Sequence, residues 1–301
     1  MDFLSELLEI YGKDKVYLNE PMNMHTTFRA GGPAKYLVKP ALTAHIVNTI
    51  SLCRKWNMDY VVLGNGSNVL VSDEGFDGVI ILLSDDFADI EIEDCVITAK
   101  AGAMLSRVAS NAARNSLTGM EFAAGIPGSV GGACVMNAGA YGGEIKDIIL
   151  SAQVIDEDGR IFTLTKDEMN LSYRSSIFSE KKYIVVQAVF ELKKGNEAEI
   201  YSVMKELAEK RREKQPLEYP SAGSTFKRPE GYFAGALIEE AGLKGRGVGG
   251  AKVSEKHAGF IVNYENATAA DIKNTIDMVK EKVKNNSGVD LECEVKLIGN
   301  F

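Results

Sequence analysis

The residues of this sequence best suited to ligand chemistry lie in two glycine-rich stretches, the first of which spans residues 64–68. Its sequence is Gly-Asn-Gly-Ser-Asn, and it follows the short apolar segment 60–63. Glycine lets successive backbone N–H groups point into one concavity that can hold phosphate oxygens, and Ser67 and Asn68 could add side-chain donors. The third glycine of a Rossmann fingerprint and the lysine of a Walker loop are both missing. A phosphate-binding nest and a tight turn therefore both stay open for this motif alone.

The second stretch carries seven glycines between Gly125 and Gly143. It opens with Gly-Ile-Pro-Gly-Ser-Val-Gly-Gly at 125–132 and continues with Asn-Ala-Gly-Ala-Tyr-Gly-Gly at 137–143. Pro127 fixes one φ angle, while the glycines permit close backbone approach to a ligand. The alternative is a glycine-rich turn before a helix of small residues. Two candidate nests in one chain, neither of Rossmann type, together favour one dinucleotide held across two lobes.

Composition and charge narrow the class of protein. The chain has 301 residues, a net charge of −8 and no basic run longer than Lys210–Arg212, which argues against a nucleic-acid groove but not against an anionic small molecule. The four cysteines form no CxxC pair, so neither a metal site nor a disulfide framework is expected. Without a run of about 18 apolar residues or a signal-peptide pattern, we expect a cytoplasmic protein that does not bind membranes.

The elements that must position these motifs follow from hydrophobic periodicity. Helices are expected at 3–11, 43–56, 104–113, about 197–213, 234–241 and from 268 onward. Strands are expected at 36–38, 60–63, 79–83, 96–101, 149–156, 160–164, 183–192, 260–263 and 291–298. Asp158-Gly159 is a two-residue hairpin signal, and Thr268 with Asp271 makes a capping box. Strands and helices without regular alternation indicate an α+β fold rather than a doubly wound sheet.

The pattern changes at a polar hinge near Gly195-Asn196, where we place a domain boundary. Residues 1–195 would form the larger domain, in two lobes at about 1–75 and 76–195, and residues 196–301 the smaller one. A chain of this length is long for a single core and sufficient for two domains.

Several motifs together resemble one known family. The pairing of the two glycine motifs is similar to the FAD-binding domain of the vanillyl-alcohol oxidase and para-cresol methylhydroxylase group. Within that group the chain resembles the UDP-N-acetylenolpyruvoylglucosamine reductase family along nearly its whole length. The further motifs that carry the resemblance are His25-Thr26-Thr27-Phe28-Arg29-Ala30-Gly31-Gly32, Tyr173-Arg174-Ser175-Ser176, Ala222-Gly223-Ser224-Thr225-Phe226-Lys227 and Glu294-Val295.

The resemblance implies a two-lobed FAD-binding domain followed by a smaller C-terminal α+β domain that binds substrate. It implies non-covalent FAD, NADPH as the hydride donor, and reduction of UDP-N-acetylglucosamine enolpyruvate to UDP-N-acetylmuramate for peptidoglycan synthesis. No nucleic acid and no obligatory protein partner are expected. The alternatives are another flavoprotein oxidase of the same FAD-binding group and a nucleotide-binding module without catalysis.

Three residues match the family's catalytic positions. The resemblance casts Arg174 as the cation that holds the substrate carboxylate, Ser224 as the proton donor to carbon, and Glu294 as a partner that stabilises the enol. A permanently charged, bidentate arginine suits the first role. Taken alone, these would be a surface ion-pair residue, a turn residue and a solvent-facing strand residue.

The remaining expected site residues line the cofactor and the substrate. Those expected to bind the cofactor are Gly64, Asn65, Gly66, Ser67, Asn68, Gly125, Ile126, Pro127, Gly128, Ser129, Gly131, Gly132, Asn137 and Gly139. Those expected to bind substrate are Tyr141, Tyr173, Lys214 and Lys227, and Lys227 is also a candidate to support a Ser224 alkoxide. The chain departs from many members of the family at Ala236 and Cys293, and its short C-terminal part favours the family's shorter form, which lacks a substrate-closing tyrosine loop.

Overall fold

The computed structural model describes residues 2–301, which divide into two compact units. Unit 1 contains the residues up to Leu18 together with Tyr36–Asn65 and Gly78–Arg211. Unit 2 contains Asn19–Lys35, Gly66–Asp77 and Arg212–Phe301. Two N-terminal segments therefore belong to the same unit as the C-terminal third of the chain.

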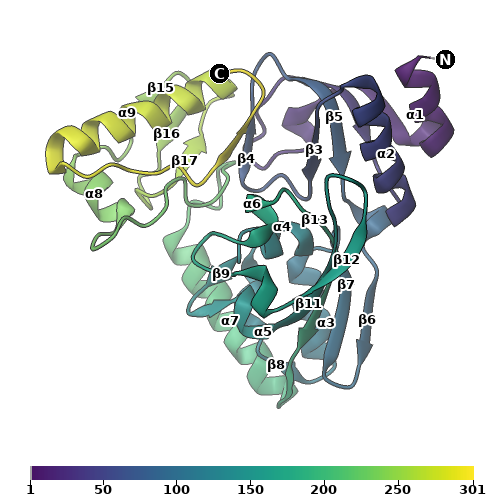
Figure 1. Cartoon of the computed structure of the whole chain (residues 1–301). Coiled ribbons are helices and arrows are strands. Elements are labelled where there is room, and N and C mark those ends of the chain that lie inside the picture. Colours follow the sequence, from purple (N-terminus) through teal and green to yellow (C-terminus); the bar gives the residue numbers. More distant parts are fainter. Residues whose placement is uncertain (1) are drawn as a thin grey trace. The chain divides into compact units, whose positions relative to one another are not determined.

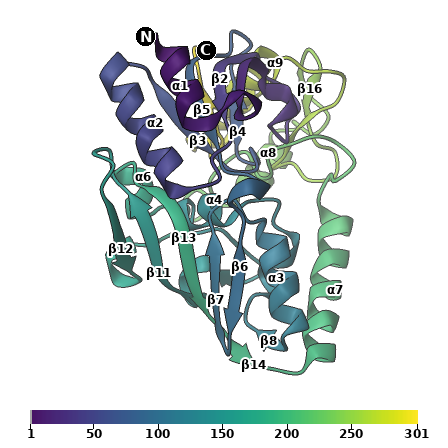
Figure 2. The same cartoon turned by 90° about the vertical axis from the view of Figure 1, so that its right-hand side faces the viewer.

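An antiparallel five-stranded sheet forms the centre of unit 1, with strand order β12-β11-β13-β7-β6 (Figure 1). Its strands are β6 (Ile90–Glu93), β7 (Val96–Lys100), β11 (Ile149–Ile155), β12 (Ile161–Thr165) and β13 (Ile184–Glu191). Helix α3 (Leu105–Arg114) lies beside β6 and β7 (Figure 2), and Val108 and Ala112 share one buried core with Ile97 of β7. Short elements complete this part: β8 (Leu117–Thr118), α4 (Val130–Val135), β9 (Gly139–Ala140), β10 (Gly143–Glu144), α5 (Ile145–Ile148), α6 (Ile177–Glu180) and β14 (Lys193–Lys194).

A four-stranded sheet of order β1-β2-β5-β3 precedes it in the chain. Its strands are β1 (Val16–Pro21), β2 (Pro33–Val38), β3 (Tyr60–Leu63) and β5 (Phe76–Leu82). Helices α1 (Phe3–Tyr11) and α2 (Thr43–Trp56) have the predicted bounds, and their apolar faces share a core with Val79 and Ile81 of β5. Strand β3 pairs in parallel with β5. The first glycine motif begins at Gly64, directly after β3 ends.

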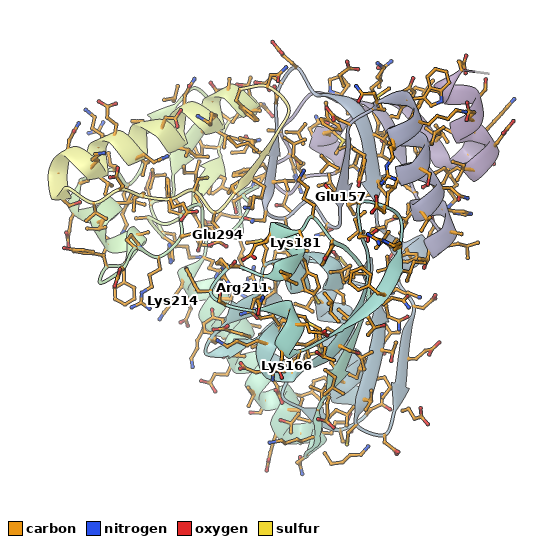
Figure 3. All side chains as sticks on the ribbon, in the orientation of Figure 1. Glu157, Lys166, Lys181, Arg211, Lys214 and Glu294 are labelled. Atoms are coloured by element: carbon orange, nitrogen blue, oxygen red, sulfur yellow. The ribbon has the colours of Figure 1, made fainter. Side chains whose placement is uncertain are left out.

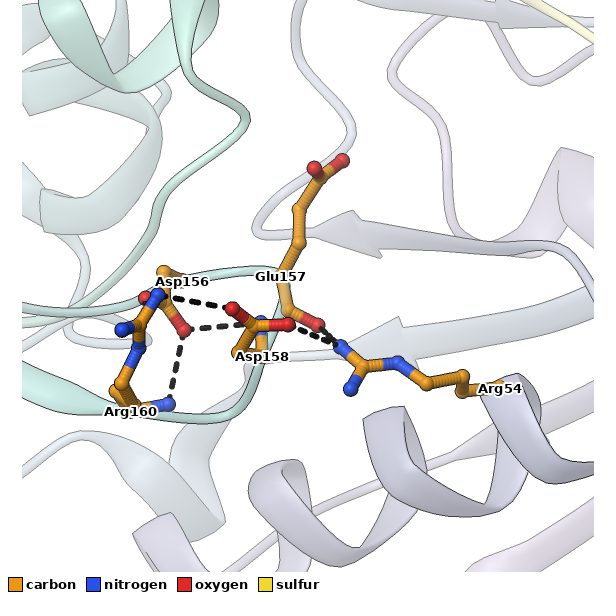
Figure 4. A network of polar contacts seen from close by, with 5 residues as sticks. All are labelled: Arg54, Asp156, Glu157, Asp158 and Arg160. Atoms are coloured by element: carbon orange, nitrogen blue, oxygen red, sulfur yellow. Dashed lines mark hydrogen bonds and ion pairs between the residues drawn. The ribbon is translucent and has the colours of Figure 1, made fainter.

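The hairpin between β11 and β12 is confirmed, but its loop is longer than the two residues predicted. Asp156 pairs with Arg160, so three residues lie between them, and of these only Gly159 has a positive φ (80°). A two-residue type I′ turn would need two such residues, which explains the difference. Arg54 of α2 donates to the Glu157 carbonyl and to Asp158, which ties the hairpin to that helix (Figure 4).

Unit 2 is built on a small antiparallel sheet covered by two helices. Strands β15 (Gly247–Val248), β16 (Ala251–Val253) and β17 (Ile261–Asn263) pair in sequence order. The helices are α8 (Ala234–Glu240) and α9 (Ala269–Ser287), and α9 buries the predicted stripe Ile272, Ile276, Val279 and Val283. Helix α7 (Glu197–Lys214) leads into this unit.

The N-terminus of α9 has two sets of hydrogen-bond acceptors. The predicted capping box between Thr268 and Asp271 is present. In addition, the Asp73 carboxylate accepts the backbone N–H groups of Ala269 and Ala270 at 2.7 and 2.8 Å. A carboxylate at this end of a helix also compensates the helix dipole, so residue 73 fastens the segment Gly66–Asp77 to α9.

The last predicted strand, 291–298, is wrong in its first half. Only β18 (Lys296–Ile298) pairs, in parallel with β4 (Val69–Val71), while Cys293 forms an isolated bridge with Phe226. The segment therefore changes partner from the loop at Phe226 to β4, which alternation of apolar residues could not indicate. No helix within residues 2–301 combines the length and the hydropathy that a membrane crossing needs.

Gly32→Ala should destabilise unit 2 because a β-carbon at residue 32 would lie 2.0 Å from the Asp73 carbonyl oxygen. Backbone atoms cannot move aside as a side chain can. We therefore expect the free energy of unfolding, measured by urea denaturation, to fall by about 3 kcal/mol. The matched control is Gly235→Ala in α8, where the nearest atom lies at 3.6 Å and alanine favours the helix. Equal stability of the two variants would contradict the close approach.

Candidate functional site

The two glycine motifs contact each other in unit 1. Asn65 Nδ2 donates to the Pro127 carbonyl at 2.7 Å. A β-carbon at Gly64 would lie 2.0 Å from Ser129 Oγ and 2.9 Å from Ser129 Cβ, so any other residue type would require Ser129 to shift. The structure therefore brings together two stretches that are 60 residues apart in the sequence, as a shared ligand site requires.

A short helix of small residues follows the second motif, as its alternative interpretation predicted. Ser129 is the N-cap of α4, and its side chain accepts from the Gly132 N–H at 3.5 Å. Gly131 donates its N–H to the Ala101 carbonyl, and its β-carbon would lie 2.9 Å from that of Ala101. Gly131 thus allows α4 to pack on the chain beneath it, while the exposed Gly132 leaves backbone open at the motif's surface.

The second half of the first motif belongs to unit 2. Gly66 has a φ of 60°, and its carbonyl accepts the Thr27 N–H at 3.1 Å. A β-carbon at Gly66 would lie 2.0 Å from the His25 carbonyl oxygen. This glycine is therefore needed for close packing against the His25–Gly32 motif, in addition to any contact with a ligand.

Arg174 occupies the third position of a tight turn in unit 1. Ser172 and Ser175 bridge across the turn, and Arg174 has a φ of 53°. Its Nη2 donates to the Gly139 carbonyl at 3.5 Å, and the Tyr173 ring centroid lies 5.4 Å from its Cζ. A left-handed backbone costs a non-glycine residue about 1–2 kcal/mol, and such strain clusters at functional sites.

Asn137 connects this turn to the second glycine stretch. It is 1% exposed and has a φ of 40°. Its Nδ2 donates to Glu144 Oε2 at 2.7 Å and to the Ser172 carbonyl at 3.1 Å, while its Oδ1 accepts the Lys146 N–H at 2.9 Å. Hydrogen bonding from Lys146 is the main cause that holds the pKa of the Glu144 carboxyl below its ordinary value, with Asn137 adding to the effect.

Ser224 and Glu294 lie on neighbouring segments of unit 2. Ser224 is exposed, and the residue after it, Thr225, is fully buried. Thr225 donates its N–H to Gly259, accepts the Ile261 N–H on Oγ1, and accepts the Glu294 N–H on its carbonyl at 2.8 Å. One residue therefore fixes both the loop that carries the serine and the backbone that carries the glutamate.

Glu294 is only 8% exposed, so the expectation for it alone, a solvent-facing strand residue, is wrong. Its carbonyl accepts a hydrogen bond from Asn68 Nδ2 at 3.1 Å, which brings the first glycine motif to the same segment. Figure 3 marks its side chain beside the segment that leads to the C-terminus. Carboxylates are seldom this deeply buried in proteins, so the position of Glu294 differs from that of an ordinary surface glutamate.

The residues expected to bind substrate are mostly exposed. Tyr141 and Tyr173 are 45% and 51% exposed, and Lys214 is exposed at the C-terminal end of α7 (Figure 3). Lys227 Nζ pairs with Glu292 Oε1 at 2.5 Å, so its charge is already balanced by a carboxylate. This ion pair weakens the expectation that Lys227 supports an alkoxide at residue 224.

Arg211 is a candidate binding residue that the sequence analysis missed. Its side chain lies against the second motif, with Nη1 3.1 Å from where a β-carbon of Gly125 would stand. Burial lowers the pKa of its guanidinium, and it makes no hydrogen bond or ion pair with any residue from 2 to 301. Spacing was the available signal, since Arg211 and Lys214 stand three residues apart and share one helix face.

These features fit an anionic dinucleotide. The chain approaches Gly64 closely at Ser129, and the Arg211 cation beside Gly125 lacks a carboxylate partner among residues 2–301. A desolvated guanidinium next to glycine backbone is suited to phosphate or another oxyanion. The residues present therefore suit the diphosphate and polar ring atoms of FAD.

Two family models match this chain. Residues 34–165 match the model of an FAD binding domain, and residues 215–298 match the UDP-N-acetylenolpyruvoylglucosamine reductase C-terminal domain. The chain is 51% identical to the UDP-N-acetylenolpyruvoylglucosamine reductase of Caldanaerobacter subterraneus over 98% of both chains. It is 54% identical to that of Agathobacter rectalis over 94% of both.

Solved structures give the same result. The crystal structure of UDP-N-acetylenolpyruvylglucosamine reductase from Thermus caldophilus has a TM-score of 0.79 and 35% identity, covering 95% of this chain and 98% of that chain. The glucose dehydrogenase Phl p 4.0202 has a TM-score of 0.52 at 16% identity, covering 65% of this chain and 45% of that chain, and shares the fold alone. The predicted α+β fold, an FAD-binding domain of the vanillyl-alcohol oxidase type with a smaller C-terminal domain, is confirmed. The chain belongs to the UDP-N-acetylenolpyruvoylglucosamine reductase family.

Proposed function

We propose that this chain reduces UDP-N-acetylglucosamine enolpyruvate to UDP-N-acetylmuramate with NADPH, in peptidoglycan precursor synthesis. The observation that carries the proposal is the 51% identity to named reductases over 98% of both chains. When bound, FAD supplies the two-electron chemistry that carries hydride from NADPH to the vinyl carbon of the enolpyruvyl group.

Except for Asn68 and Asn137, whose amides donate to protein carbonyls, the cofactor-binding residues are those expected from the sequence, with Arg211 added. The contact between Gly64–Asn65 and Pro127–Ser129 supports a shared cradle for non-covalent FAD. Arg211 would place a positive charge beside Gly125, where an oxyanion or the electron-rich part of a ring could lie. The backbone N–H of Gly131 donates to the Ala101 carbonyl at 2.9 Å, whereas that of the exposed Gly132 donates to Ser129 only at 3.5 Å, so Gly132 is the better donor candidate.

Arg174 would hold the substrate carboxylate and stabilise the enolate that forms after hydride addition. The Arg174 guanidinium contacts the Gly139 carbonyl and the Tyr173 ring, and a cation placed before the reaction stabilises developing charge without reorganisation. Tyr173, next to it and half exposed, could pack against the sugar, as could Tyr141.

Ser224 would donate the proton to the carbon next to the carboxylate, and Glu294 would stabilise the enol. The exposed Ser224 hydroxyl can reach a bound substrate, whereas the buried Glu294 offers a carboxylate shielded from water. Since a serine hydroxyl is a weak acid, the transfer depends on the strong basicity of the enolate.

The functional division of the chain is part of the proposal. An FAD-binding domain at 1–195, with lobes at about 1–75 and 76–195, and a substrate-binding domain at 196–301 are supported by the family matches at 34–165 and 215–298. A cytoplasmic location and the absence of protein, nucleic-acid and membrane partners are further parts of it. The oxidase alternative gains no specific support, because the likeness to a glucose dehydrogenase concerns the fold alone.

The reaction itself is tested by anaerobic stopped-flow absorbance of the yellow protein. NADPH should bleach the visible flavin band, and UDP-N-acetylglucosamine enolpyruvate added second should restore it rapidly without oxygen. Bleaching without recovery would leave a flavoprotein but discard the substrate. Absence of FAD uptake on titration would refute the cofactor site at the two glycine motifs.

Ser224→Ala should slow the second half-reaction, recovery by substrate, by roughly 10²–10⁴-fold, because general acid catalysis typically contributes that much. Bleaching by NADPH should be nearly unchanged. The control is Ser202→Ala on the exposed face of α7, which should alter neither step. Equal slowing of both steps in Ser224→Ala would mean that the serine orients the flavin instead.

Arg174→Lys should also impair the second half-reaction, by about 10²-fold, because an ammonium group cannot replace a bidentate fork at a developing negative charge. The thermal midpoint should stay close to that of the parent protein. Arg114→Lys, at the end of α3, is the matched control and should turn over normally. A normal rate of recovery by substrate in Arg174→Lys would remove this residue from the mechanism.

A further inference from the structure

We propose that Asn68 and Asn137, one from each glycine motif, are positioning residues that fix the backbones of Glu294 and of the Arg174 turn. This inference rests on the proposed function and goes beyond it, because it assigns both asparagines to the alignment of reacting groups rather than to the cofactor. Each case stands on contacts within one unit.

In unit 2 the backbone of Glu294 is held from two sides. Its N–H donates to the Thr225 carbonyl at 2.8 Å, and its carbonyl accepts from Asn68 Nδ2 at 3.1 Å. Two residues later, Lys296 donates its N–H to the Asn68 carbonyl at 3.0 Å, where β18 begins to pair with β4. Asn68 therefore uses both its side chain and its backbone on the segment that carries the glutamate.

These contacts leave Glu294 little freedom of position. With only 8% of its surface exposed, the side chain is surrounded by protein atoms, and the position of its backbone helps to set where the carboxylate lies. Thr225 controls the backbone from the side of Ser224, and Asn68 controls it from the side of the first glycine motif. Loss of the amide would free the carbonyl of residue 294 and let the carboxylate drift from the reacting carbon.

In unit 1 Asn137 holds the turn that carries Arg174. Its Nδ2 donates to the carbonyl of Ser172, the first residue of the turn, at 3.1 Å. Glu144 and the Lys146 N–H bind the rest of the amide, so its orientation is fixed from three sides. Because Arg174 is in a strained left-handed conformation, the turn needs such outside restraint to persist.

The two asparagines share one feature, namely that their amides donate to protein carbonyls on the segments of Glu294 and Arg174. The loops that would surround the cofactor thus also align the groups that act on substrate. A displacement of about 1 Å can slow an enzyme by about 10²-fold, so removal of either amide should affect the substrate step selectively.

The test uses Asn68→Ala and Asn137→Gly in the FAD-loaded enzyme. Each should slow recovery by substrate about 10- to 100-fold, while FAD affinity and bleaching by NADPH stay within about twofold of the parent. Glycine at 137 keeps the left-handed backbone while removing the amide. Asn170→Gly, at another left-handed position (φ 47°), is the control for that backbone change and should turn over normally.

Double-mutant cycles separate positioning from a general structural effect. Asn68→Ala should cost little further rate once Glu294→Gln is present, and Asn137→Gly should cost little once Arg174→Lys is present, because each asparagine acts through its partner. Additive losses, or weaker FAD binding with a normal substrate step, would overturn the inference. No recovery by the enolpyruvyl sugar in the parent enzyme would instead refute the proposed function.

Discussion

The close approach of Gly64 to Ser129 is the constraint from which the site in unit 1 is built. With 2.0 Å between a β-carbon at residue 64 and the Ser129 side-chain oxygen, a residue larger than glycine would displace Ser129. It sets the end of β3 against the N-cap of α4, and Asn65 reinforces it by a hydrogen bond to Pro127. The two glycine motifs, about 60 residues apart in the sequence, therefore lie side by side. We expect their backbone N–H groups, more than their side chains, to contact the ligand.

Charged side chains near the candidate site residues differ in whether another side chain of the protein balances their charge. Glu144 has Lys146 beside it and Lys227 has Glu292, so these charges are balanced within the protein. Arg211 is different, because burial disfavours its charged form and no carboxylate among residues 2–301 compensates it. An unpaired, desolvated cation of this kind destabilises the folded protein, and a bound anionic ligand can offset that destabilisation. The same logic explains why ligand binding should stabilise unit 1 against unfolding.

The sequence predicted most elements of the fold because their hydrophobic faces are local. Helices α1, α2 and α9 and four strands of the five-stranded sheet follow from periodicity within a dozen residues, whereas its edge strand β6 was not predicted. Other features depend on contacts between distant residues, which periodicity does not encode. Examples are the Asp73 cap on α9, the pairing of β18 with β4 and the burial of Glu294. The catalytic candidates follow from resemblance to a family, whereas the positions of Arg211 and of the asparagine amides depend on how distant segments pack in the folded chain.

Backbone strain links these observations in unit 1. Asn137, Tyr141 and Arg174 all have φ between 40° and 53°, a region that disfavours residues with a β-carbon. Glycine would relieve the strain at each position, and the neighbouring Gly139, Gly142 and Gly143 indicate that glycine is well tolerated in this stretch. Side chains are nevertheless kept there, and two of them have visible tasks: Asn137 bonds to the turn at Ser172, and Arg174 reaches Gly139. Strain of about 1–3 kcal/mol at such a residue persists only where surrounding contacts enforce it. The hydrogen bonds of Asn137 are contacts of that kind. The Asn137 amide therefore stabilises the strained turn, and that turn positions the Arg174 guanidinium.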